Sequence, residues 1–257
     1  MTQIDILERL YSAHGGREAW QSLSIVHARF SSGGVAYASR FWSGGLHSLP
    51  VSVYVPARRV VLNDYPWPGW WGEWNDSHVS IGRAGSPASK TRERARERFT
   101  GWVSHPAWDE LDLLYFVGYA LWNYLSFPHL LSLPGVELLP LEGGRSGEPT
   151  LLRVDFPADV PTHSRRQHFH LDGEARLRRH DYVAEVFGPW AAGANFCLGN
   201  ERVDGLRFYT RRRVVPSLGR VASMPIPTLV WIELDGIHVV RSRDCANAEL
   251  SLAGLAA

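Results

Sequence analysis

One run of apolar residues, from Trp108 to Phe127, constrains the fold of this chain more than any other segment. A membrane span needs about 20 consecutive apolar residues, and here Asp112 and Asn123 interrupt the run before Pro128 ends it. Apolar side chains occupy nearly every side of the predicted helix, so the helix must be buried on most of its faces. A helix that lies inside a curved β-sheet meets this requirement, and we expect no membrane span.

The segments on both sides of this helix alternate between apolar and polar residues, which is typical of β-strands. Before the helix, strands are predicted at 24–32, 35–42, 51–55 and 59–63. After it, they are predicted at 136–140, 150–156, 163–171, 176–187, 193–202, 206–215 and 226–240. Residues 3–13 and 17–23 are predicted to be helices, the first ended by Gly15 and Gly16.

This order predicts an α+β fold, mostly β, in a single domain over 1–257. We expect N-terminal helices at 1–23, a β-meander at 24–82, a helical insertion at 88–130 and a second β-meander at 135–240. The sheet is predicted to be one curved antiparallel sheet or half-barrel, with the buried apolar helix covering a cavity. Such a cavity is the default site for a small ligand.

Composition excludes several classes of function. The net charge of +1 argues against a nucleic-acid-binding protein, and the alternating charges of 91–98 indicate a solvated helix or linker. Cys197 and Cys245 are the only cysteines, which indicates no dependence on disulfides. The first residues lack the basic and apolar regions of a secretory signal, so we expect a cytoplasmic protein.

The hairpin predicted at 163–187 is the most informative segment for function. Alternation places His163, Gln167, His180 and Tyr182 on its more apolar, interior face, together with Arg165, Arg176 and Arg178. Buried polar groups need partners, so the cluster is either a satisfied core network or the polar end of a ligand cavity. In the second case His163 and His180 would move protons and Tyr182 would donate to a developing oxyanion, which makes these three the catalytic candidates. Gln167 is then a ligand-binding candidate.

A metal site and a cofactor site both lack support. His168, His170 and Glu174 have a cupin-like spacing, but the two histidines lie on the predicted exterior face and Glu174 falls at the turn. No nucleophile elbow, phosphate-binding loop or dinucleotide fingerprint follows a predicted strand. We therefore expect neither a metal nor a cofactor.

Further ligand-binding candidates lie elsewhere in the chain. Arg212 faces inward on its predicted strand, and an arginine there requires pairing within the protein or an anionic ligand group such as a carboxylate or enolate. The stretch 65–74, rich in Trp, Pro and Gly, predicts a loop over the core or an aromatic rim at the mouth of a cavity, and contributes Trp70 and Trp71. The buried helix contributes Tyr115, Tyr119 and Trp122.

Several motifs together resemble a widespread group of uncharacterised bacterial proteins of about this length. They are His14-Gly15-Gly16 with Trp20, the run from Tyr115 to Trp122, His163-Ser164, Arg179-His180-Asp181-Tyr182, and Thr210 to Arg213. The order of helices and meander also resembles the lipoprotein carriers of the LolA and LppX type. That resemblance implies a half-open β-barrel whose helices close an apolar cavity for acyl chains.

Three functions remain open from the sequence. The first is intracellular binding of a bulky apolar molecule, acyl or polyketide-like, with cofactor-free acid–base cyclisation or isomerisation as an accompanying reaction. The second is a lipid carrier without catalysis. The third is an interaction module that binds a protein partner through the Trp-rich stretch.

Overall fold

The computed structural model describes residues 2–100, 106–143, 147–219 and 222–242 of the chain. The first half contains helices α1 (Gln3–His14), α2 (Arg17–Gln21) and α3 (Val35–Ala38) and the 3-10 helix η1 (Ala95–Phe99). Its strands are β1 (Leu23–Gly33), β2 (Leu46–Tyr54), β3 (Arg59–Asn63), β4 (Trp70–Asn75), β5 (His78–Arg83) and β6 (Ala88–Glu93). Helix α4 (Glu110–Leu125) and the 3-10 helix η2 (His129–Ser132) follow. The remaining strands are β7 (Glu137–Glu142), β8 (Thr150–Asp155), β9 (Arg166–Leu171), β10 (Leu177–Val183), β11 (Ala192–Val203), β12 (Leu206–Leu218), β13 (Ala222–Ser223) and β14 (Val230–Arg241).

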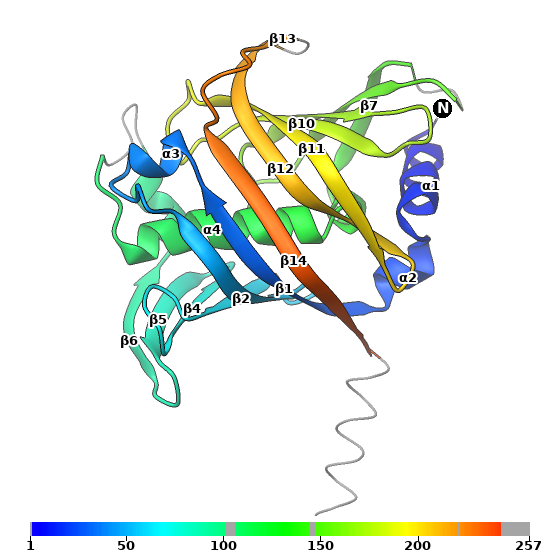
Figure 1. Cartoon of the computed structure of the whole chain (residues 1–257). Helices are drawn as coiled ribbons and strands as arrows, with labels where there is room; N and C mark the ends of the chain where they lie inside the picture. Colours follow the sequence, from blue (N-terminus) through cyan, green and yellow to red (C-terminus); the bar gives the residue numbers. More distant parts are fainter. Residues whose placement is uncertain (1, 101–105, 144–146, 220–221, 243–257) are drawn as a thin grey trace, which may run out of the picture.

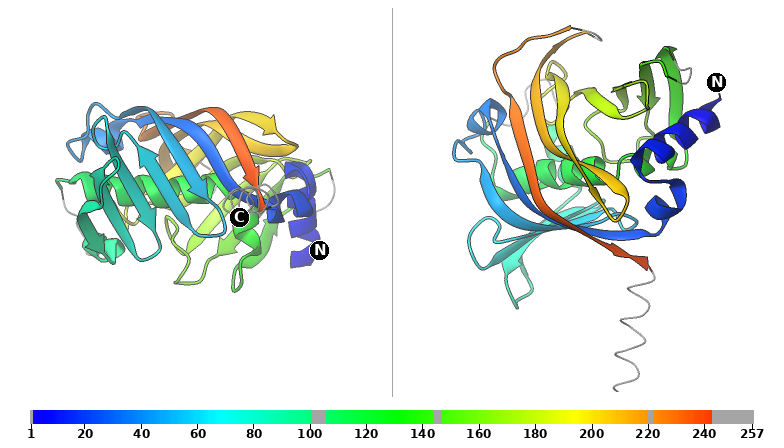
Figure 2. Two further views of the ribbon diagram at one scale, coloured as in Figure 1. Left: turned by 90° about the horizontal axis from the view of Figure 1, so that it is seen from below. Right: turned by 45° about the vertical axis from the view of Figure 1, so that its right-hand side comes forward.

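These strands form one antiparallel sheet that curves around α4 (Figure 1). The order is β6-β5-β4-β3-β2-β1-β14-β12-β11-β10-β9-β8-β7, with β13 paired to β12. The two meanders are therefore joined through β14, which pairs with both β1 and β12. Strands β6 and β7 end the order, so the sheet stays open, and Figure 2 shows α4 within its curve. The predicted half-barrel with N-terminal helices is confirmed.

Three local predictions are wrong. Residues 35–38 form α3 and not a strand, because Gly34 adopts a left-handed φ of 126° and turns the chain into the helix. Trp70–Asn75 is a strand and not a loop, with the turn confined to residues before Trp70. Residues 88–93 form β6, which extends the first meander beyond the predicted limit at 82. The predicted single domain stays a prediction.

Helix α4 is buried almost completely, as its apolar surface predicts, because every residue from Leu111 to Leu125 is buried. At Gly118 the helix passes so near β4 that an added Cβ would overlap the Cβ of Trp74. Only glycine permits the helix backbone to pack this closely against the strand. Gly118 therefore fixes how deeply α4 lies in the sheet.

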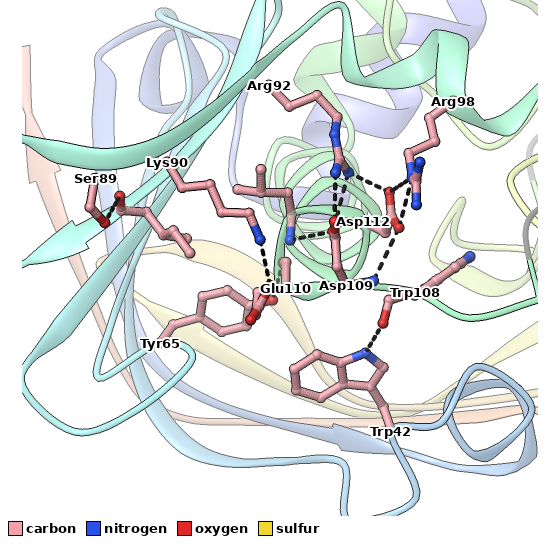
Figure 3. Close-up of polar contacts among 12 residues, drawn as sticks. Trp42, Tyr65, Ser89, Lys90, Arg92, Arg98, Trp108, Asp109, Glu110 and Asp112 are labelled. Carbon is pink, nitrogen blue, oxygen red and sulfur yellow. Dashed lines mark hydrogen bonds and ion pairs between the residues drawn. The ribbon is translucent and has the colours of Figure 1, made fainter.

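A network of charges holds the first turn of α4 (Figure 3). Asp109 caps the helix, and the buried Asp112 completes the capping box. Arg92 lies 2.6 Å from Asp112 and 2.6 Å from Asp109, and Arg98 lies 2.7 Å from Asp112. The segment 91–98, predicted to be solvated, thus supplies two arginines that anchor the helix.

Helix α1 is joined to the sheet through His14. The Nδ1–H of His14 donates to the Leu10 carbonyl at 2.7 Å, which leaves Nε2 to accept from the Tyr209 hydroxyl at 2.8 Å. Burial lowers the pKa of His14 to about 4, so the ring is neutral at neutral pH. Gly15 ends the helix at a φ of 116°, which explains the His14-Gly15 motif structurally.

Candidate functional site

An apolar cavity of about 310 Å³ lies between α3, α4 and the strands β10, β11, β12 and β14. Its walls include Val35 of α3, Phe116 of α4, Phe187 after β10, and Val214 and Val230 of the sheet. Trp190 lies at the surface beside it and is 67% exposed, and Val35 is 49% exposed. Exposed apolar side chains beside an apolar hollow are typical of a small-molecule binding surface.

Tyr182 joins this cavity to the polar cluster predicted from the hairpin. Its ring stacks on that of His163, with centroids 3.7 Å apart and planes 5° from parallel. Its hydroxyl lies 3.0 Å from that of Tyr124 on α4, which in turn lies 2.9 Å from His163 Nε2. The Tyr119 hydroxyl lies 3.1 Å from His163 Nδ1. Three tyrosines thus surround one imidazole, and Tyr182 alone of them borders the 310 Å³ cavity.

Every member of this network is neutral at neutral pH. Burial lowers the pKa of His163 well below its ordinary value, and the nearby positive charges of Arg96 and Arg212 lower it further. Burial raises the pKa of Tyr182 and Tyr119 well above the ordinary value, and that of Tyr124 to about 12. The three hydroxyls and the imidazole form one hydrogen-bonded network, in which His163 is a weak base.

His180 and Gln167 form a second pair on the same interior face. His180 Nε2–H donates to Gln167 Oε1 at 2.5 Å, and Gln167 Nε2 donates to the Ser164 carbonyl at 2.7 Å. The His180 ring stacks on Phe169 at 4.1 Å. Burial lowers the pKa of His180 well below its ordinary value, and the nearby His163 and Arg212 lower it further. This pair is satisfied and neutral.

Strand alternation placed four of the seven polar residues of the hairpin correctly and three wrongly. His163, Gln167, His180 and Tyr182 are buried, whereas Arg165 and Arg178 are exposed and Arg176 is half-buried. A bulge between Leu177 and Arg179 reverses the alternation inside β10 and explains Arg176 and Arg178, whereas Arg165 precedes the first residue of β9 and lies outside the regular strand. On the outer face, Arg179 and His170 both contact Asp181. In the described part of the chain, no three His, Cys, Asp or Glu side chains are placed to hold a metal ion.

Arg212 is 2% exposed, as its predicted inward orientation requires. Its guanidinium lies 4.3 Å from the centre of the Tyr124 ring and 5.5 Å from that of Tyr209. Nη1 donates to Cys197 Sγ at 3.3 Å. Among the described residues no carboxylate forms an ion pair with Arg212, and its Nε has no hydrogen-bond partner. Cys245, the other cysteine, lies outside the described residues.

The aromatic candidates lie in different places. Tyr119 belongs to the His163 network, but Trp122 faces the first meander, where its Nε1 donates to the Val55 carbonyl. Trp70 and Trp71 lie half-buried on β4, and neither borders the 310 Å³ cavity. Trp71 donates to the Arg83 carbonyl, and Trp70 packs on Trp67.

Tyr115 borders a separate polar hollow of about 350 Å³. This hollow also contains Arg96, which donates to the Thr162 carbonyl at 3.0 Å and to Glu185 at 2.5 Å. The Arg96 guanidinium lies 5.8 Å from the centre of the Tyr119 ring. Arg96 therefore connects the polar hollow to the back of the His163 network.

Most of the cavity wall has no recognisable signal in the sequence. Val35 was assigned to a strand, and Phe187 and Trp190 lie around a turn whose packing no periodicity reveals. Val214 had a usable signal, because it alternates in phase with Arg212 and so shares its inner face. Arg96 had no usable signal in the sequence, because its charged neighbours indicate a solvated segment.

Comparison with solved structures identifies the architecture. A LolA superfamily protein from Nitrosomonas europaea superimposes with a TM-score of 0.50 at 10% identity, covering 93% of this chain and 94% of its own. A DUF1329 family protein from Desulfovibrio piger superimposes with a TM-score of 0.51 at 13% identity, covering 92% of each chain. No protein-family model and no curated protein sequence matches the chain. The class defined here is therefore a LolA-like open β-sheet around a central helix, as the architectural resemblance implied.

Proposed function

We propose that this protein binds a bulky apolar small molecule, acyl or polyketide-like, in the 310 Å³ cavity beside Tyr182, and that it does so in the cytoplasm. The cavity carries the proposal, because its volume falls in the range of small-molecule sites, about 300–1,000 Å³. Its wall is apolar apart from a few polar groups such as Tyr182 and Ser39. No helix among the described residues is long and apolar enough to cross a membrane.

Native mass spectrometry of the freshly purified protein, followed by organic extraction, tests the proposal first. We expect an apolar molecule to be retained or a long-chain probe to be taken up at one equivalent. The Ala184→Trp substitution adds an indole to the cavity wall and should abolish uptake. Ala57→Trp, in an exposed turn outside the cavity, is the matched control and should leave uptake unchanged. Equal uptake by both variants contradicts the proposal.

A second candidate is cofactor-free acid–base cyclisation or isomerisation of the bound molecule. Tyr182 favours it, because its hydroxyl connects the cavity edge through Tyr124 to His163. The extracted ligand, incubated with the protein and followed by NMR, should then convert to a product. Tyr182→Phe should slow the conversion, and His163→Gln and His180→Gln should slow it as well. An unchanged ligand supports the carrier alternative.

The interaction-module alternative rests on Trp70 and Trp71. Both are half-buried, and Trp67 beside them is 50% exposed. This alternative predicts a protein partner that is lost on Trp70→Ala or Trp71→Ala, together with no small molecule in the cavity. Retention of an extractable ligand in both variants argues for the cavity.

A further inference from the structure

Arg212 places a full positive charge in the interior, and no carboxylate among the described residues forms an ion pair with it. A guanidinium remains protonated at any physiological pH, and buried charges are normally paired. Yet the partners of Arg212 among the described residues are two aromatic rings and a sulfur, none of which carries a negative charge at neutral pH. The Nε–H of Arg212 is buried and finds no acceptor in the part of the chain that the structure describes.

Other unpartnered polar atoms belong to the same region. Asn195 is fully buried, and neither its amide nitrogen nor its amide oxygen has a hydrogen-bond partner among the described residues. Its strand register places it opposite His180 on β10 and opposite Val214 on β12. Arg212 and His180 border a common void with Asn123, whose Oδ1 is also unpartnered. A void of about 10 Å³ holds at most one water, which would satisfy hydrogen bonds but not the charge.

This region adjoins the apolar cavity. Arg212 and Val214 are successive inward residues of β12, about 7 Å apart along the strand, and Val214 forms part of the cavity wall. Tyr182 and Phe116 border both the large cavity and a void of about 20 Å³. Tyr124 borders that void and the one beside Arg212. The Tyr124–Tyr182 hydrogen bond therefore lies between the apolar cavity and the unpaired cation.

We propose that the ligand of this protein is an acid, with its apolar chain in the 310 Å³ cavity and its carboxylate paired with Arg212. The inference rests on the proposed function and specifies its substrate class. A carboxylate supplies the missing negative charge and accepts from Arg212 Nε–H and from the Asn195 amide. When the carboxylate binds, it replaces the hydrogen bond between the hydroxyls of Tyr124 and Tyr182. Both hydroxyls can then donate to the carboxylate.

Isothermal titration calorimetry with dodecanoic acid and methyl dodecanoate at pH 7.5 tests the inference, because the two probes share a chain and differ in charge. We expect wild type to bind the acid at least tenfold more tightly than the ester. Arg212→Met should remove this preference while retaining the affinity for the ester. Arg211→Met makes the same change on the exposed face of the same strand and should keep the preference.

The outcomes separate the two proposals. If wild type binds acid and ester equally, or if the preference survives in Arg212→Met, the acid assignment is wrong and the apolar site stands. If neither probe binds, the proposed function fails and the inference fails with it. If Arg212→Met does not fold, wild type decides the question through NMR of carboxyl-labelled dodecanoic acid. The pKa of the bound carboxyl should be lower than that of the free acid, because the guanidinium stabilises the ionised form. A bound pKa equal to or higher than that of the free acid overturns the inference.

Discussion

The guanidinium of Arg212 lies over the ring of Tyr124, 4.3 Å from its centre, and thereby connects the sheet to the central helix. Tyr124 uses its ring for this contact and its hydroxyl for contacts with His163 and Tyr182. Tyr124 of α4 thus contacts Arg212, His163 and Tyr182 at once. The position of α4 therefore decides the geometry of the site.

The depth of α4 should depend on Gly118. Gly118→Ala is expected to destabilise the protein by about 1–3 kcal/mol, because the new methyl overlaps Trp74 and pushes the helix from the sheet. Urea denaturation measures the change in free energy of unfolding. Gly44→Ala is the control, since a Cβ there meets nothing within 4 Å. Equal stability of the two variants would show that the helix yields without strain.

The hydroxyls of Tyr124 and Tyr182 should differ in their effect on stability. Tyr124→Phe leaves both His163 Nε2 and the Tyr182 hydroxyl without their partner, so a loss of about 2–3 kcal/mol is expected. Tyr182→Phe removes only the terminal hydroxyl and should lose about 1 kcal/mol. Thermal and urea unfolding of both variants gives the order. The reverse order would contradict the hydrogen-bond chain.

The buried carboxylate of Asp112 should matter more than an exposed one. Asp112→Asn leaves Arg92 and Arg98 without their shared buried partner and is expected to lose about 2–3 kcal/mol. This value is below that for fully buried pairs, because both arginines are partly exposed. Glu97→Gln removes an exposed ion pair with Arg94 and should change stability by less than about 0.5 kcal/mol. A comparable loss in both variants would rule out a special role for the α4 anchor.

The pH dependence of stability should report the burial of His14. Its folded pKa of about 4 lies below the ordinary value of 6.5, so the unfolded chain binds the proton more strongly. The contribution of neutral His14 is complete above pH 6.5 and is lost as the pH falls towards 4, by roughly 3 kcal/mol over that window. His14→Gln should flatten the profile between pH 6.5 and 4 relative to wild type, whereas His47→Gln, at an exposed position, should not. If the pH profiles of stability for wild type and His14→Gln run parallel, then His14 does not cause the pH dependence of stability.

Strand alternation was reliable wherever the sheet is regular. The interior positions of Gln167, Tyr182 and Arg212 follow from the period of two, since a strand with one buried face sorts its side chains by polarity. The same rule misplaced Arg178, because a bulge is a property of pairing between two strands and leaves no mark in the pattern of one. Charge patterning likewise misjudged Arg92 and Arg98, whose partners lie on a helix that follows later in the chain.

The sequence by itself determined the buried central helix, the two meanders and the inward orientation of His163, His180 and Tyr182 in the hairpin. These features depend on local periodicity, which hydrophobic burial imposes directly on the order of residues. Only the tertiary structure decided where the apolar cavity lies and which residues form its wall. That wall combines α3, α4, a turn and the four neighbouring strands β10, β11, β12 and β14, and only the curvature of the sheet brings them together. The lack of an ion pair between Arg212 and any described carboxylate was decided in the same way, because whether a carboxylate lies beside a buried cation depends on how distant segments pack.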